Sequence, residues 1–274
     1  MKPYYQDEYV QIFHGDCRDI LPSLPKVDLV LTDPPYGIGY DKQQDIMAKS
    51  GRISNSGKWK QYNDDWDKPI TRNLLNQVLE AGENQIIWGG QFYNLRPDRK
   101  WLVWNKIQRG IMTDGEMAWT SFDKGLHIFD MSRADAYINK TDGKYHPTQK
   151  PVQLFQWCLE LLSKENEDVL DPFMGSGTTL LAAKKLNRKC IGIEIEEKYC
   201  EIAAKRCSMS KEDQRIRRAL NQNICKLAQI LDNIDTKCTK DCPRFDGCPV
   251  IMGEDLQDEI TRRWLEILEE VRWK

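Results

Sequence analysis

The alternation of short apolar runs with amphipathic helical segments constrains the fold of this chain more than any other feature. Runs rich in valine, isoleucine and leucine, bounded by glycine, proline or aspartate, predict strands. These runs are 9–16, 27–33, 84–90, 100–106, 168–173 and 189–195. Apolar residues at helical spacing predict helices over 151–162, 178–186 and 197–206. Because alternating strands and helices pack as a mostly parallel, doubly wound sheet, we expect an α/β domain over residues 1–210.

The composition bounds the remaining possibilities. The length of 274 residues allows one large domain with an appendage. After the last predicted helix the sequence becomes polar and rich in cysteine. We therefore expect a small helical C-terminal appendage over residues 211–274. No run approaches the ~18 apolar residues of a membrane span, and the first ten residues lack a secretory core. Since the net charge is −2, a nucleic-acid-binding face has to be local. These features predict a cytoplasmic protein with no membrane partner.

The strand at 27–33 ends in Asp33-Pro34-Pro35-Tyr36. Proline has no N–H and restricts the residue before it, so the chain leaves the sheet along a rigid path. The turn then presents a carboxylate, the Pro34 carbonyl and an aromatic ring. Two acceptors suit an amino group, which has two donors, and Tyr36 can stack on the ring that bears it. The turn therefore predicts a site for an aromatic amine, the alternative being a strand end with a capping aspartate.

A second strand end carries glycines in place of prolines. Gly175 and Gly177 precede a predicted helix, where they allow backbone N–H groups to approach a ligand. The segment lacks the lysine of an ATP-binding loop. Glu194 ends the next strand, 19 residues after Gly175, at the distance of an acid that binds ribose hydroxyls. Asp16 ends a third strand and can accept from an adenine amine, but by itself it is better interpreted as a turn aspartate. Together these residues predict a nucleoside-containing cofactor, against the alternative of ordinary turns with surface carboxylates.

Five segments in this order resemble the amino-group DNA methyltransferases that use S-adenosylmethionine. They are Gly15-Asp16, Thr32–Tyr36, His146–Pro151, Asp171–Thr179 and Ile191–Arg206. The aspartate–proline turn precedes the glycine loop, as in the β-type permuted subgroup, and the resemblance covers roughly residues 9–206. It implies a Rossmann-like α/β fold with a seven-stranded mixed sheet. It also implies direct methyl transfer to an exocyclic nitrogen of a base flipped out of double-stranded DNA.

The resemblance implies a role for each matching residue. The flipped base would be held by Asp33, Pro34, Pro35 and Tyr36. The cofactor would be held by Asp16, Asp171, Phe173, Gly175, Ser176, Gly177, Thr178, Glu194, His146, Thr148 and Lys150. Within that set, Glu194 would bind the ribose and Asp16 the adenine, while the last three would close over the methionine end. An acid at position 33 favours N6 of adenine, because family members that act on N4 of cytosine more often carry serine there.

Other functions remain to be weighed against this one. Methylation at C5 of cytosine is excluded, because it needs a cysteine nucleophile in a Pro-Cys step that this chain lacks. Turns of this type also hold the amines of RNA bases and of protein glutamine. A non-catalytic DNA-binding regulatory protein is an alternative of another class. If the chain is a methyltransferase, it would act in a restriction–modification system or as an orphan or phage enzyme.

Two polar regions are candidates for contact with DNA. Residues from about 107 to 145 are the candidate target-recognition insert, and the loop 41–68 is predicted to order on DNA. Their basic neighbours are candidates for phosphate contacts, the alternative being a solvated face. The candidates are Lys42, Lys49, Arg52, Lys58, Lys60, Arg96, Arg99, Lys100, Lys106 and Arg109.

The cysteine content leaves two readings open. The chain has nine cysteines, an odd number, which favours a reducing compartment. Cys238, Cys242 and Cys248 are spaced as loop ligands, and Cys225 is a candidate fourth ligand for structural zinc. Unligated reduced thiols explain the same spacing. The sequence also leaves the oligomeric state open, with a homodimer among the alternatives.

Overall fold

The computed structural model describes the predicted α/β domain. The described residues are 2–38, 68–97, 99–107, 113–123, 125–136, 145–146 and 148–209. The predictions for residues 41–67, for the appendage 211–274 and for Cys225, Cys238, Cys242 and Cys248 lie outside them. No helix in the described part of the chain combines the length and the apolar content needed to cross a membrane. The described residues include no group of three side chains able to hold a metal ion.

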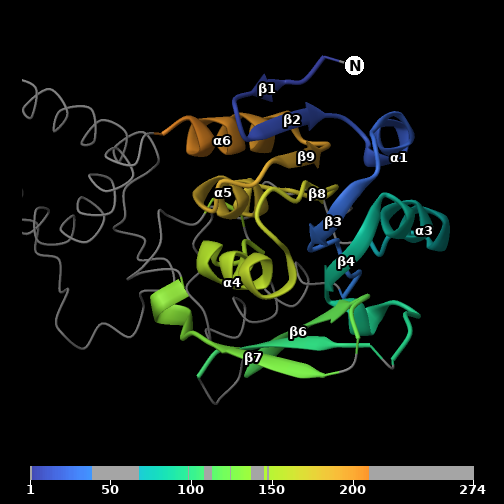
Figure 1. Cartoon of the computed structure of the whole chain (residues 1–274), viewed down its shortest axis with the longest axis vertical. Helices are drawn as coiled ribbons and strands as arrows, with labels where there is room; N and C mark the ends of the chain where they lie inside the picture. The colour runs from blue at the N-terminus through green and yellow to red at the C-terminus, as the bar shows by residue number, and fades with distance from the viewer. Residues whose placement is uncertain are drawn as a thin grey trace, which may run out of the picture.

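One mixed sheet forms the centre of the domain (Figure 1). Its strands are β1 (Tyr5–Gln6), β2 (Val10–His14), β3 (Val27–Thr32), β4 (Gly82–Trp88), β5 (Trp101–Asn105), β6 (Gly115–Thr120), β7 (Leu126–Asp130), β8 (Val169–Asp171) and β9 (Cys190–Glu194). Their spatial order is β1-β2-β9-β8-β3-β4-β6-β5-β7. Strand β1 is antiparallel to β2, and β6 is antiparallel to both of its neighbours. All other neighbours are parallel.

The expected number of seven strands is wrong, because the described sheet has nine. The spatial order shows that one strand is added at each edge, β1 beside β2 and β7 beside β5. The Asp7 carboxylate accepts from the backbone N–H groups of Tyr9 and Val10 at 2.8 Å, which closes the tight turn that brings β1 back onto β2. Strand β7 pairs with β5 along its whole length. Both are edge strands without a strongly buried pattern, so local periodicity did not predict them.

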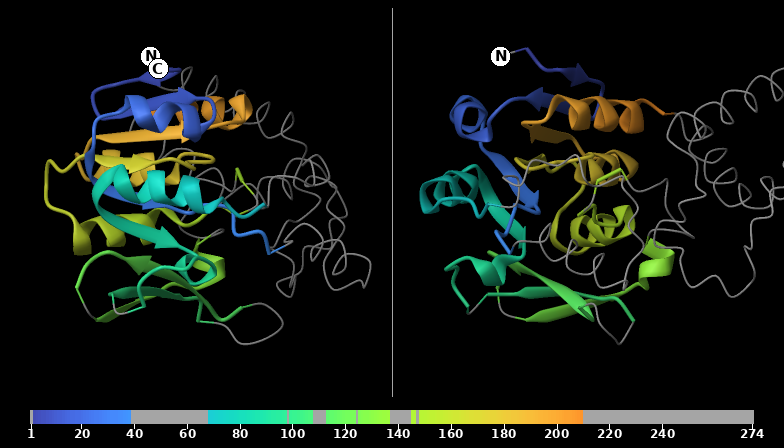
Figure 2. Two further views of the ribbon diagram at one scale, coloured as in Figure 1. Left: turned by 90° about the vertical axis from the view of Figure 1, so that its right-hand side faces the viewer. Right: turned by 180° about the vertical axis from the view of Figure 1, so that it is seen from behind.

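Helices cover the two faces of the sheet. They are α1 (Cys17–Ile20), α3 (Arg72–Glu80), α4 (Val152–Leu162), α5 (Thr178–Lys185) and α6 (Glu197–Ser208), with short 3-10 turns η1 (Leu21–Ser23) and η3 (Gly90–Phe92). Helices α4, α5 and α6 lie on one side, and α1 and α3 lie on the other (Figure 1). Each side has its own core, with Leu154 and Leu180 in one and Ile20 and Leu74 in the other. The views in Figure 2 show the same two layers from the side and from behind.

Six predicted strands and three predicted helices are confirmed. The elements that the sequence did not predict, β6 and β7 among them, also bear on the site. The described part of the candidate insert 107–145 contributes β6 and β7 to the sheet, so this part of it builds the fold. Strands β2, β9, β8, β3 and β4 are mutually parallel neighbours. Their carboxyl ends therefore meet at one edge of the sheet, which is where ligands bind in folds of this kind.

Candidate active site

A rigid turn follows β3 at this edge. The Asp33 carboxylate accepts a hydrogen bond from the Tyr36 hydroxyl. The hydroxyl of Tyr93 donates to the Pro35 carbonyl at 2.8 Å, which ties the turn to the segment after η3. The structure therefore places the predicted carboxylate, carbonyl and ring in one fixed turn.

The ring of Tyr36 has two close neighbours. It stacks on Phe92, with 5.1 Å between ring centroids and 28° between planes. Gly89 approaches so closely that an added β-carbon would lie 2.0 Å from the Tyr36 Cε1 atom. Phe92 is half exposed, so an apolar surface continues from the turn towards solvent. The sequence did not single out Phe92, because nothing local marks an aromatic residue on a short 3-10 turn.

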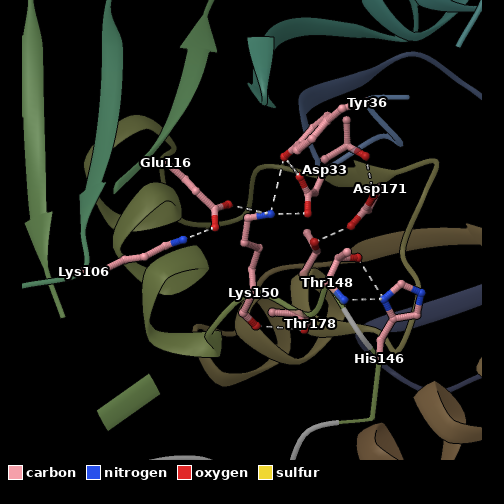
Figure 3. Close-up of polar contacts among 11 residues, drawn as sticks. Asp33, Tyr36, Lys106, Glu116, His146, Thr148, Lys150, Asp171 and Thr178 are labelled. Carbon is pink, nitrogen blue, oxygen red and sulfur yellow. Dashed lines mark hydrogen bonds and ion pairs between the residues drawn. The ribbon is translucent and has the colours of Figure 1, made fainter. Parts of the chain in front are cut away.

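A chain of alternating charges leads from the turn into the sheet (Figure 3). The Lys150 ammonium lies 2.5 Å from Asp33 Oδ2 and 3.0 Å from Glu116 Oε2. Glu116 also contacts the Lys106 ammonium at 2.6 Å through its other oxygen. The side chains of Lys150 and Lys106 are only 5% and 4% exposed. Two carboxylates, which are 17% and 29% exposed, and two buried ammonium groups therefore balance each other.

Burial and pairing act in opposite directions on these groups. Burial lowers the pKa of the Lys150 ammonium, but Asp33 and Glu116 raise it well above its usual range. Burial raises the pKa of Glu116, whereas Lys150 and Lys106 bring it down to about 2. Burial raises the pKa of Asp33, and the Lys150 ammonium opposes this effect. Lys150 and Glu116 are therefore charged at neutral pH. Of the two carboxylates, Asp33 takes up a proton more readily than Glu116.

The interpretation of Lys106 as a phosphate contact is wrong. Its side chain is buried and paired with Glu116, and it donates to the Thr113 hydroxyl at 3.1 Å. The cause is its position directly after β5, opposite the start of β6. A lysine in this place neutralises an internal carboxylate and does not face a DNA backbone.

The glycine loop joins β8 to α5. Gly175 and Gly177 have φ angles of +50° and +80°, which favour glycine. A β-carbon on Gly177 would lie 2.7 Å from the Ala203 Cβ atom, so the loop lies directly against α6. Thr178 begins α5, and its hydroxyl is 3.4 Å from the Lys150 carbonyl. The loop thus lies between α6 and the segment that carries Lys150.

The buried Asp171 carboxylate stabilises this loop through hydrogen bonds. Its carboxylate accepts from the Thr32 hydroxyl at 2.6 Å, from the Phe173 N–H at 3.0 Å and from the Thr179 hydroxyl. Burial raises its pKa to about 6. Since Thr32 ends the strand that leads to Asp33, this carboxylate connects the turn after β3 to the glycine loop. Thr32 was not among the predicted site residues.

The segment around His146 lies over the loop. A β-carbon on Gly175 would be 3.7 Å from the His146 ring, which also meets Tyr199 edge-on at 4.6 Å. Thr148 binds the ring nitrogen Nδ1 through its hydroxyl at 3.0 Å. The Gln149 side-chain oxygen accepts from the Ser176 hydroxyl at 3.1 Å. The predicted closing segment and the predicted loop are therefore neighbours in the structure.

A buried arginine supports this assembly. Arg206 donates to the Ser176 carbonyl and lies 3.2 Å from the Ser176 hydroxyl oxygen. Its guanidinium lies 5.1 Å from the centre of the Tyr145 ring. Helical spacing signals this position, because Tyr199, Ala203 and Arg206 share the buried face of α6. Arg206 was not among the predicted site residues.

Two acids lie at the ends of the neighbouring strands β2 and β9. Asp16 caps α1 and holds Arg18 with both carboxylate oxygens, and this hydrogen bonding lowers its pKa. Glu194 accepts from the N–H groups of Gly175 and Glu196 at 3.0 Å and 2.9 Å. Burial raises the pKa of Glu194 to about 7. The glycine loop and the two acids lie along one edge of the sheet, which fits a nucleoside with a charged tail.

Comparisons with known proteins agree with this geometry. A family model described as DNA methylase matches residues 103–205. YubD of Escherichia coli (strain K12), named as a methylase, is 30% identical over 211 residues, which are 69% of this chain and 86% of that protein. The Type II methyltransferase M.HindIII of Haemophilus influenzae is 47% identical over 169 residues, 61% of this chain and 50% of that protein.

A solved structure is similar in fold. The PvuII DNA methyltransferase, described as cytosine-N4-specific, matches with a TM-score of 0.51 and 15% identity. The match covers 81% of this chain and 95% of that one. At this identity the likeness concerns the arrangement of strands and helices.

Proposed function

This chain belongs to the family of amino-group DNA methylases, and we propose that it methylates the exocyclic N6 of an adenine flipped out of double-stranded DNA. The observation that carries the proposal is the turn after β3. Asp33 and the Pro34 carbonyl supply two acceptors for one amino group, and Tyr36 supplies a face for the purine ring. The acid at position 33 supports adenine over cytosine.

The cofactor site fits the methyl donor. Bound S-adenosylmethionine supplies an electrophilic methyl group on a positively charged sulfur. The positive φ angles of Gly175 and Gly177 place the loop between the His146 ring and α6, and Glu194 offers a carboxylate at the end of β9. Asp16, two residues beyond β2, stands beside it. We assign the nucleoside part to these acids and the charged tail to the loop and the His146 segment.

The residues of the turn orient the amine for direct transfer. Hydrogen bonds to Asp33 and to the Pro34 carbonyl direct the nitrogen lone pair away from both acceptors. Bound S-adenosylmethionine would supply the methyl carbon, and the electron pair of its carbon–sulfur bond would stay on sulfur as the nitrogen–carbon bond forms. The nitrogen becomes cationic and loses a proton, which the Asp33 carboxylate is placed to accept. Positioning supplies most of the rate, and no covalent bond to the protein forms.

The biological setting follows from the relatives and the thiols. M.HindIII is named a Type II methyltransferase, which supports a role as the modification enzyme of a restriction–modification system. Cys17, Cys158, Cys190, Cys200 and Cys207 are buried free thiols, which supports a reducing, cytoplasmic location.

The test is transfer of labelled methyl from S-adenosylmethionine to mixed-sequence duplex DNA, with the product nucleosides identified by mass. We expect N6-methyladenine from the wild type and none from Asp33→Ala. Asp123→Ala removes a fully exposed carboxylate on the turn between β6 and β7 and should match the wild type.

Each other result assigns a different function. N4-methylcytosine without N6-methyladenine would replace adenine by cytosine as the substrate. Cofactor binding without any label in DNA would redirect the search to RNA, to protein amides or to a regulatory role.

A further inference from the structure

The Lys150 ammonium is paired with the Asp33 carboxylate, which the proposed reaction needs. In this structure its ammonium lies 2.5 Å from Asp33 Oδ2, while the Tyr36 hydroxyl donates to the other oxygen. Both oxygens of Asp33 therefore already have a donor. Lys150 also lies 5.7 Å from the centre of the Tyr36 ring. An amino group that binds to Asp33 enters beside a full positive charge.

That charge opposes the transfer itself. The target nitrogen gains positive charge as it bonds to the methyl carbon. A cation held on the same carboxylate raises the energy of this state, and the effect is larger than in bulk water because Asp33 is only 17% exposed. The ammonium therefore has to leave Asp33 for the reaction to proceed efficiently.

Glu116 is placed to bind the displaced Lys150 ammonium. Its Oε2 atom is already 3.0 Å from the Lys150 ammonium, and its other oxygen is bound to Lys106. Glu116 comes from β6, on the side of Lys150 away from the turn (Figure 3). A small movement of one flexible side chain shifts the ammonium from Asp33 to Glu116. The four charges stay balanced, because Lys106 holds Glu116 in place throughout.

We propose, on the basis of the proposed function, that Glu116 is a positioning residue that takes over Lys150 when the target amine binds to Asp33. Lys150 stays paired with Asp33 while the site holds no base, so that this carboxylate is not left unpaired. Glu116 then keeps the displaced ammonium in the site and away from the reacting nitrogen. The pair acts as a two-position switch between a resting and a base-bound arrangement.

The test uses full-length protein and the double variant Glu116→Gln with Lys106→Met. Removing one charge of each sign keeps the cluster neutral, so folding is preserved better than in Glu116→Gln alone. The methylated site is first mapped by sequencing DNA from cells that express the wild type. A duplex with 2-aminopurine next to the target adenine, which keeps its 6-amino group, then reports base capture by fluorescence. The control removes an exposed pair of the same kind, Glu83→Gln with Lys26→Met, whose charges lie 2.9 Å apart.

We expect the double variant to lose about 10- to 100-fold in kcat and to show weaker 2-aminopurine fluorescence, because Lys150 stays on Asp33. Affinity for S-adenosylmethionine and the Tm should match those of the control. Glu116→Asp keeps the charge and should restore kcat to within about 10-fold of the wild type.

Three results would overturn either the proposed switch or the proposed function. Wild-type kcat and fluorescence in the double variant would overturn the switch. An equal loss of cofactor affinity and Tm would also overturn it, by showing that Glu116 only supports the fold. Absence of methylation by the wild type would instead overturn the proposed function, before any variant is compared.

Discussion

Gly89 lies directly against the ring of Tyr36, at a distance that no other residue type tolerates. A β-carbon at position 89 would be 2.0 Å from Cε1 of the ring, and the φ angle of Gly89 is +66°. Gly89 follows β4, whereas Tyr36 follows β3, and the two strands are parallel neighbours. The glycine thus fixes the position of the ring that is proposed to stack on the target base.

Gly89→Ala is expected to displace Tyr36. We expect kcat to fall by about 100-fold, because the base would be misplaced by about 1 Å or more. Affinity for S-adenosylmethionine, measured by calorimetry, should change little. Gly125→Ala is the matched control, since Gly125 also has a positive φ but the nearest atom to its added carbon is 3.7 Å away. Equal effects of the two substitutions would trace the loss to backbone strain and not to the ring.

Glu194 should make cofactor binding depend on pH. Burial raises the pKa of its carboxyl to about 7 in the folded protein, against an ordinary value of 4.5. The folded state therefore holds the proton more tightly than the unfolded state. The stabilisation from this group is present at low pH and is lost as the pH rises through about 7.

Ribose hydroxyl groups donate more strongly to the ionised carboxylate. Affinity for S-adenosylmethionine should therefore rise between about pH 6 and pH 8. Calorimetric titration should show this rise in the wild type and in Glu201→Gln, an exposed control on α6. Glu194→Gln should bind weakly at every pH; an undiminished pH dependence in this variant would assign the titration to another group.

Arg206 should support cofactor binding without touching the reacting atoms. Arg206→Met leaves the buried Ser176 carbonyl without its donor, at a cost of about 1–3 kcal/mol. We expect affinity for S-adenosylmethionine to fall by about 10-fold or more. Arg188 is similarly buried but precedes β9, at the opposite edge of the sheet from the loop. Arg188→Met should therefore lower the Tm without this loss of affinity, and similar affinities in both variants would contradict the assignment.

The bond between Thr32 and Asp171 should link the two halves of the site. Thr32→Val keeps the shape of the side chain but removes a donor at 2.6 Å. We expect about 1–2 kcal/mol of lost stability and a lower kcat, because the turn after β3 and the glycine loop lose their connection. Thr120→Val also removes a buried donor, to the Lys100 carbonyl, on the far side of β4. If both variants lower kcat equally, as measured by methyl transfer, the bond has only a structural role.

The sequence alone predicted strands, helices and turns whose signals lie in neighbouring residues. Apolar runs predicted the inner parallel strands, and the prolines after Thr32 and the glycines around Ser176 predicted where the chain leaves the sheet. These signals are local because backbone restrictions act on one or two residues at a time. The order of the segments then indicated the family, which the relatives confirm.

Only the tertiary structure decided what surrounds Asp33. Glu116, Lys106 and Lys150 come from separate segments, and nothing near Glu116 in the sequence marks it as internal. The edge strands and the burial of Lys106 were missed for the same reason. Pairing between strands and between buried charges depends on packing across the whole domain, because each partner is stabilised only once the others are in place. The sequence therefore determined which chemical groups follow the strands, and the fold decided which charges surround them.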